Sequence, residues 1–212
     1  MSRRSTGGTP RPPGRPMDTS LTPAMIEAVL DELAESGYAR LTTAGVARRA
    51  GVSTATLYRR WPTKRDLILA AAEQMASSET DGIDTGSLHG DIRELLTRKQ
   101  LLVSGKAGAV LVALLGEAAH DAELAEMIRS GVVAPTREYL SAMLDRAVAR
   151  GEIDADVTAD AATRLLEGLA LARAAFGGSA AGGETGEMTS TDIDADAALI
   201  LRALGHRRNH PA

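Results

Sequence analysis

Apolar side chains recur every three or four residues along most of this chain, a spacing that places them on one face of an α-helix. The first such stripe contains Ile26, Val29, Leu30 and Leu33. It predicts a helix that begins at Pro23 and ends near Gly37, because Thr22 can cap it and proline is favoured in the first turn. Similar stripes predict three more helices, over residues 43–50, 54–60 and 64–78.

The region after residue 78 is predicted to be helical as well. A polar loop over 79–86 precedes apolar stripes at residues 88–102, 110–115, 124–128 and 140–148. Pro135 is expected to break or kink the chain between the last two stripes, because proline interrupts the helical hydrogen-bond ladder. Further helices are predicted over 158–176 and 192–204, with a loop over 177–191. Aromatic residues make up only 2% of the chain, so the predicted fold class is all-α, with about nine helices.

The segment between Leu41 and Leu69 contains two short helical patterns joined by the sequence Ala50-Gly51-Val52-Ser53. Gly51 can end the first helix, because glycine enters the left-handed region at little cost. Ser53 can begin the second helix by accepting hydrogen bonds from backbone N–H groups of its first turn. A short second helix that carries hydroxyl and guanidinium groups suits the major groove of DNA. The pattern therefore predicts a DNA-binding helix-turn-helix.

The residues around this turn resemble the signature of the tetracycline-repressor (TetR) family of bacterial regulators. The matching positions are Thr43, Val46, Ala47, Ala50, Gly51, Val52, Ser53, Leu57, Tyr58, Trp61 and Lys64. The resemblance implies an N-terminal three-helix DNA-binding domain and a C-terminal helical bundle for ligand binding and dimerisation. It also implies a repressor that binds a palindromic operator as a dimer and is released by a small-molecule effector.

Charge is distributed unevenly along the chain. Residues 1–65 carry 11 Lys and Arg against five Asp and Glu, a net charge of +6, whereas residues 66–212 carry 13 against 23, a net charge of −10. A basic N-terminal part suits contact with phosphate, and ordinary variation in charge is the alternative. The predicted division is a flexible basic arm (1–20), a DNA-binding domain (21–65), a connecting helix (66–78), a ligand-binding and dimerisation domain (79–206) and a tail (207–212). The arm either enters the minor groove or is a solvated tail.

The predicted DNA-binding residues lie on and around the second helix of the motif. They are Thr43, Ser53, Thr54, Ala55, Thr56, Tyr58, Arg59, Arg60 and Lys64. Threonine hydroxyls can reach base edges or phosphate, whereas alanine offers only apolar contact. The resemblance implies that Thr43, Tyr58 and Lys64 hold the DNA backbone, and only one of the two arginines is expected to face the groove. Helix capping or plain solvent exposure is the alternative for each hydroxyl, and Trp61 is expected to fill the small core.

The resemblance also implies an effector pocket and a dimer interface in the C-terminal domain. The candidate pocket residues are Leu102, Leu111, Leu114, Met127, Leu140, Met143 and Phe176. The candidate interface residues are Leu165, Leu166, Leu169, Ala172, Leu199, Ile200 and Leu204. Core packing within one chain is the alternative for both sets. The apolar character of the pocket candidates favours an apolar or amphipathic effector, and methionine suits a wall that adapts to its ligand.

Catalysis and metal binding have little support in the sequence. The histidines do not pair with a suitable nucleophile, and no glycine-rich stretch has the pattern of a P-loop. The chain has no cysteine, which excludes disulfides and thiolate metal sites. No apolar run reaches the roughly 18–20 residues of a membrane span, and no secretory segment is recognised. The chain is therefore expected to be a cytoplasmic, homodimeric regulator without cofactor or metal, whose partners are double-stranded DNA and a small-molecule effector.

Two other functions stay open at this point. One is an activator or architectural DNA binder that responds to no effector, and a ligand that abolishes operator binding would argue against it. The other is a helical small-molecule carrier or enzyme that retains a vestigial DNA-binding head. Replacing Tyr58 and Lys64 by alanine tests that alternative, since a vestigial head would have no sequence-specific DNA affinity to lose.

Overall fold

The structure, a computed structural model, describes residues 23–154, 156–176 and 190–206, and its regular elements there are all helical. They are α1 (Pro23–Arg40), α2 (Thr43–Ala50), α3 (Thr54–Arg60), α4 (Lys64–Thr80), α5 (Leu88–Val103), α6 (Lys106–Ala118), α7 (Ala122–Ile128), the π-helix η1 (Arg129–Val133), α8 (Ala134–Ala149), α9 (Ala159–Phe176) and α10 (Ser190–Ala203). The all-α prediction is confirmed. The predicted arm, the tail and most of the predicted 177–191 loop lie outside the described residues. No single described helix is long and apolar enough to cross a membrane, and α5 and α6 meet that test only as a pair bent by 80°.

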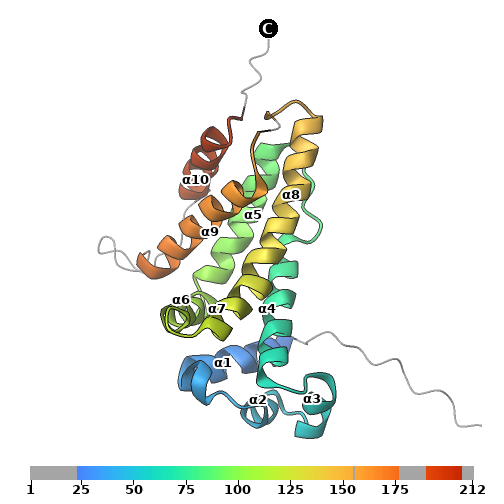
Figure 1. Ribbon diagram of the computed structural model, residues 1–212. Helices are drawn as coiled ribbons and strands as arrows, with labels where there is room; N and C mark the ends of the chain where they lie inside the picture. The colour runs from blue at the N-terminus through green and yellow to red at the C-terminus, as the bar shows by residue number, and fades with distance from the viewer. Residues whose placement is uncertain (1–22, 155, 177–189, 207–212) are drawn as a thin grey trace, which may run out of the picture.

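The helices form a small head at one end of a longer body (Figure 1). The head is α1, α2 and α3, and the body is α5 to α10 together with η1. Helix α4 runs from the end of α3 into the body, where it packs on η1, α7, α8 and α5. Helices α9 and α10 both pack on α5, and α9 also contacts α6 and α8. Helix α4 is therefore the element that joins the two regions.

The predicted bounds of α2 and α3 and the predicted start of α4 are confirmed. The Thr42 hydroxyl accepts a hydrogen bond from the Gly45 N–H at 3.0 Å and begins α2. Gly51 ends α2 with a φ of 67°, the left-handed conformation that favours glycine. At the start of α4, Thr63 and Asp66 form a capping box, in which each side chain accepts from the other residue's backbone N–H. These local hydrogen bonds set where each short helix begins.

Three predicted boundaries differ from the structure. Gly37 does take a positive φ, 70°, but helical structure resumes after it and α1 extends to Arg40. Helix α4 includes Glu79 and Thr80, so the predicted 79–86 loop begins two residues too early. Pro135 does not interrupt the helical structure, because it lies in the first turn of α8, which directly follows η1. Proline needs no N–H partner in that turn, and the preceding π-helical segment carries the change in helical register.

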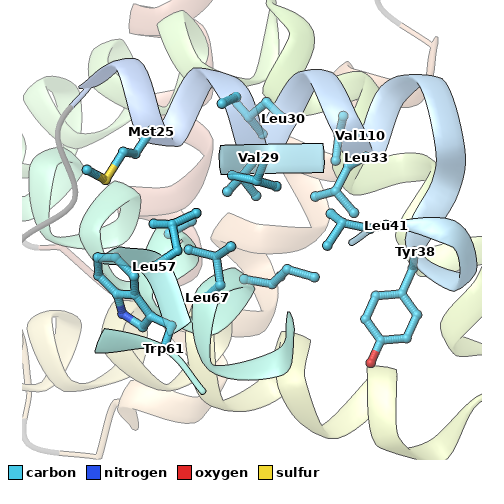
Figure 2. Close-up of a cluster of buried hydrophobic side chains, with 14 of the residues drawn as sticks. Met25, Val29, Leu30, Leu33, Tyr38, Leu41, Leu57, Trp61, Leu67 and Val110 are labelled. Atoms are coloured by element: carbon cyan, nitrogen blue, oxygen red, sulfur yellow. The ribbon is translucent and has the colours of Figure 1, made fainter. Parts of the chain in front are cut away.

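Buried apolar side chains form two clusters. The lower core joins the head to α4, as Figure 2 shows for residues such as Val29, Leu57, Trp61 and Leu67, and it also takes Val110, Leu124 and Met127 from α6 and α7. The upper core lies within α5, α8, α9 and α10, with Leu88, Leu95, Leu140, Met143, Leu166 and Ile200 among its members. The lower core therefore crosses the boundary between head and body, and Trp61 fills it as expected.

Candidate functional site

Helix α3 turns a polar face outward. Thr54, Ala55, Tyr58 and Arg59 are exposed, whereas Leu57 has no exposed surface and packs in the lower core. One buried leucine on a seven-residue helix is enough to set its rotation, because side chains one position away point in other directions. The predicted side chains therefore lie where a nucleic acid can reach them.

The corner before α3 is held by its own hydrogen bonds. The Gly51 N–H donates to the carbonyls of Ala47 and Arg48, which closes the end of α2. The Ser53 hydroxyl accepts from the Thr56 N–H at 3.1 Å and lies 2.8 Å from the Thr56 hydroxyl. Capping was the alternative to DNA contact for these hydroxyls, and both take part in it. Thr54 has no such role among the described contacts, so its hydroxyl is better placed for an incoming base or phosphate.

The two arginines at the end of α3 differ in exposure. Arg59 is exposed, whereas Arg60 is half-buried and its guanidinium lies 6.0 Å from the centre of the Trp61 ring. The Arg60 Nε is buried without a hydrogen-bond partner among the described residues. Only one arginine was expected to face a groove, and the exposures favour Arg59.

Lys64 and Thr43 are engaged within the head. The Lys64 ammonium donates to the backbone carbonyls of Tyr38 at 3.1 Å and Ala39 at 3.4 Å, and it lies 4.3 Å from the centre of the Tyr38 ring. This position neutralises the negative end of α1 and fixes the start of α4. Thr43 is only 4% exposed, so its hydroxyl has little access to phosphate in this conformation. The contacts of both residues with DNA stay predictions.

An ion pair fixes α2 against α1. The Arg49 Nε lies 2.6 Å from a Glu32 oxygen, and the same guanidinium also binds Glu35. Glu32 is buried, and a Cβ at Gly45 would lie 2.0 Å from its carboxylate. Hydrogen bonding and attraction to Arg49 lower the pKa of Glu35. Glycine at 45 thus leaves room for the Glu32 carboxylate beside Arg49.

Two adjoining cavities lie behind the head. The larger, about 400 Å³, is lined by residues of α4, α5, α6, α7, η1, α8 and α9. The smaller, about 100 Å³, lies between α1, α4, α5, α6, η1 and α8. Their shared walls are Glu79, Lys99, Leu102, Leu111 and Val132. The volume of the larger cavity lies within the range of about 300–1,000 Å³ that is typical of small-molecule sites.

The predicted pocket residues divide into two groups. Leu102 and Leu111 line both cavities, and Leu114 lines the smaller one. The other four candidates line neither cavity: Met127 lies in the lower core, Leu140 and Met143 lie in the upper core, and Phe176 is 73% exposed. Helical spacing identified these residues as apolar, but it could not separate a cavity wall from a filled core.

The predicted dimer residues divide in the same way. Leu166, Ile200 and Leu204 are at most 3% exposed in the upper core of one chain, so they are not available to a partner. Leu165 and Leu169 are half-buried and pack against that core. The candidates that stay exposed are Ala172 and Leu199, and Phe176 joins them. The alternative of burial within the monomer therefore holds for part of the set.

Three charged residues of the cavity wall were not among the predicted site residues. Glu79, Lys99 and Glu167 come from α4, α5 and α9, and they form what is here called the ionic triad. A signal for Lys99 was present, because it follows Leu95 and Leu96 and precedes Leu102 and Val103 on one helical face. A charged residue within an apolar stripe indicates either a buried ion pair or a ligand contact.

A helix-turn-helix head with an outward polar helix, joined by one helix to a hollow helical body, defines this chain as a DNA-binding regulator by its architecture. Comparison with known proteins agrees. Residues 25–71 match the family described as bacterial regulatory proteins of the tetR family, and residues 83–193 match the tetracyclin repressor-like C-terminal domain. The chain belongs to the TetR family and is a helix-turn-helix transcriptional regulator, not an enzyme.

Individual relatives resemble the chain over most of its length. The uncharacterized HTH-type transcriptional regulator YdeS of Bacillus subtilis is 30% identical over 155 residues, which cover 73% of this chain and 78% of that protein. The DNA-binding transcriptional repressor TetR of Mycobacteroides abscessus is 31% identical over 156 residues, with 73% and 82% covered. The crystal structure of the TetR family transcription regulator SCO0332 aligns with a TM-score of 0.62 at 28% identity, over 86% of this chain and 95% of that chain. The similarity thus extends through head and body.

Proposed function

We propose that this regulator is a cytoplasmic repressor, that it binds a palindromic operator as a homodimer, and that a small molecule in the larger cavity releases it. The observation that carries the proposal is the position of α4, which borders both cavities and is joined to α3 by only residues 61–63. A ligand that changes the position of α4 changes the position of the head on the same rigid element. Release requires that the ligand bind the two arrangements with different affinity.

Operator recognition in this proposal rests on α3. Thr54 and Arg59 are assigned to base edges, and Tyr58, which is 50% exposed, is assigned to phosphate together with Lys64 and Thr43. The duplex is obtained by selection from a random library with the full-length protein. Thr54→Ala should then relax the base preference at one position per half-site, at a cost of about 1–3 kcal/mol. Tyr58→Phe should weaken binding to all sequences alike, and fluorescence anisotropy on matched and mismatched duplexes separates the two effects.

The dimer in this proposal forms through α9 and α10. Leu199 and Phe176 are large apolar residues with 47% and 73% of their surface exposed, and a twofold axis would pair each with its copy. Leu199→Glu should shift the protein from dimer to monomer in light scattering. Leu101→Glu is the matched control, since Leu101 is 77% exposed on α5. A protein that is monomeric before either substitution, or a dimer that survives Leu199→Glu, would remove this part of the proposal.

The effector step is tested with the selected operator and a library of small molecules. A compound that enters the cavity should weaken operator binding. Leu111 lines both cavities, so Leu111→Trp should narrow them and reduce the response without loss of basal DNA affinity. A regulator whose operator affinity no cavity ligand changes would instead be effector-independent. A ligand that tightens operator binding would make the protein a co-repressor-dependent regulator and would contradict release.

A further inference from the structure

The ionic triad is an unusual feature for the wall of an apolar cavity. The Lys99 ammonium lies 2.8 Å from Glu79 Oε2 and 3.0 Å from Glu167 Oε1. The side chains of Lys99 and Glu79 are 6% and 7% exposed, and that of Glu167 is 20% exposed. Buried charges are costly unless they are fully paired, so a cluster at this position requires a physical explanation.

Pairing within the triad is incomplete. Two carboxylates face a single ammonium, which leaves one surplus negative charge when all three groups are ionised. Glu79 Oε2 and Glu167 Oε1 are buried, and neither has a hydrogen bond of good geometry among the described residues, although both lie at ion-pair distance from Lys99. Burial raises the pKa of Glu79, although attraction to Lys99 opposes this rise. The triad therefore retains an unused capacity to accept hydrogen bonds and positive charge.

The other charges of the larger cavity do not supply the missing partner. Arg137 is paired with Asp160, and both side chains are more than half exposed. Arg164 also borders the cavity and is exposed, so solvent screens its charge. Leucine and valine side chains, among them Leu102, Leu111 and Val132, form the rest of the wall near the triad. The cavity thus combines a buried acceptor site with an apolar surface.

We propose that the ligand of the larger cavity is an amphipathic organic cation, whose ammonium group binds Glu79 and Glu167 and whose apolar part lies against Leu102 and Leu111. This inference rests on the proposed effector function and specifies its chemistry. The incoming cation takes over carboxylate contacts that Lys99 holds in the free protein. An ammonium provides up to three N–H donors to the two oxygens that lack aligned donors here.

The same site gives the ligand direct access to the connecting helix. Glu79 lies in the last turn of α4, whereas Lys99 and Glu167 belong to α5 and α9. In the free protein, the Glu79–Lys99 pair ties the end of α4 to the body. A cation that replaces Lys99 at Glu79 exchanges this tie for a contact with the ligand, and the far end of the same helix carries the head.

The test uses full-length protein and three probes with the same eight-carbon chain: octylammonium, octanoate and 1-octanol. Binding is measured by isothermal titration calorimetry. Octylammonium should bind more tightly than 1-octanol by roughly tenfold to a hundredfold, the range expected for hydrogen bonds to charged groups. Octanoate should bind more weakly than either probe, because it meets the surplus negative charge.

Variants of the triad should move the affinity for octylammonium in opposite directions. Glu167→Gln and Glu79→Gln keep the side-chain shape and should reduce it to the level of 1-octanol, without changing 1-octanol binding. Glu73→Gln is the matched control, since Glu73 is exposed on α4, six residues before Glu79. Lys99→Met removes the competing ammonium and should tighten octylammonium binding. A triad that acted only in folding would give weaker binding, or none, in all three triad variants.

Three results would overturn the inference: a preference for octanoate that Lys99→Met abolishes, equal binding of the three probes, or binding of none of them. The proposed function is scored separately, by fluorescence anisotropy of the selected operator with and without each probe. If octylammonium binds more tightly than the other probes but does not release the operator, the cation site is supported and the effector function is contradicted. If only the neutral probe, 1-octanol, releases the operator, the effector function is supported and the cation site is contradicted.

Discussion

Two short helices of the head and two long helices of the body begin in different ways. Helices α2 and α3 are seven or eight residues long, and each starts at a hydroxyl side chain, Thr42 or Ser53, that accepts a backbone N–H. Helices α6 and α8 of the body have 13 and 16 residues and begin without any side-chain cap. Short helices are marginal in water and depend on such caps, whereas long helices gain most of their stability from packing. Helices α2 and α3 therefore depend on local caps, whereas α6 and α8 depend on packing. The other body helices α5, α7 and α9 also begin at side-chain caps, Ser87, Asp121 and Thr158.

The two regions also differ in how their cores are bounded. The upper core draws only on the body and the loops next to it, but the lower core combines all three head helices with α4, α6 and α7. A further contact between head and body is the hydrogen bond from the Tyr38 hydroxyl to the Met127 sulfur at 3.5 Å. The head is consequently a distinct motif in sequence but not an independent unit in packing. This difference can be tested by substitutions in one core, between η1 and α4, or on the surface of the head.

The largest effect is expected from Leu57→Ala in the lower core, compared with Leu140→Ala in the upper core. Both leucines have no exposed surface, so each substitution should lower the free energy of unfolding by about 2–5 kcal/mol in urea denaturation. Only Leu57→Ala should also weaken operator binding while the protein stays folded, because Leu57 sets the rotation of α3. Leu101→Ala, at an exposed position, should change stability by no more than about 0.5 kcal/mol. Equal loss of operator binding in the two core variants would contradict the division between the cores.

A smaller effect is expected where η1 packs against α4. A Cβ at Gly131 would lie 2.8 Å from Leu69 Cδ1 and 3.0 Å from the Ala72 Cβ, so Gly131→Ala should push the two elements apart. Overpacking of this kind costs about 1–3 kcal/mol, and the displacement of α4 should also change operator affinity. Gly116→Ala is the control, since its Cβ would meet nothing within 4 Å, and it should raise stability by up to about 1 kcal/mol. If Gly131→Ala changes stability but leaves operator affinity intact, α4 does not couple the cavity to the head.

The smallest effect concerns the surface ion pairs of the head. In the folded protein, the hydrogen bond to Arg49 lowers the pKa of Glu35. This contact therefore stabilises the head at pH values above 4.5, the ordinary pKa of a glutamate. The stabilisation should be lost as the pH falls through the lowered pKa. Glu35→Gln should therefore lose less stability than the wild-type protein between pH 6 and 3, measured as the urea midpoint. Glu138→Gln, at an exposed position on α8, should follow the wild-type curve.

Most of the head could be predicted from the sequence because its signals are local. Gly51 and Ser53 act on residues within one turn of themselves, and the structure contains both predicted contacts. The exposures of Thr54, Tyr58 and Arg59 follow from the helical period once Leu57 is inward. Thr43 and Lys64 are harder to predict, because their environments come from packing against α1 rather than from their neighbours in sequence.

Far less of the body's chemistry could be predicted. The helical period gives the apolar face of each helix, but it does not tell which part of that face meets another helix and which part borders a cavity. Leu102 and Leu140 look alike in sequence, yet one lines the cavity and the other lies in the upper core. Glu79 was assigned to a loop because the end of α4 carries no cap signal that the sequence reveals. The ionic triad joins three helices that are far apart in the chain, so only the fold brings it together.

The lower core has a practical consequence for chimeric regulators. Grafting this head onto the body of a relative would leave Met25, Leu33 and Tyr38 facing foreign side chains unless Val110, Leu124 and Met127 were transplanted with it. The useful crossover point therefore lies beyond α7 rather than at the end of the helix-turn-helix. A hybrid joined there would keep the donor's lower core intact, but the α5 side chains Leu88, Ile92 and Leu95 would then have to fit the foreign α8, α9 and α10.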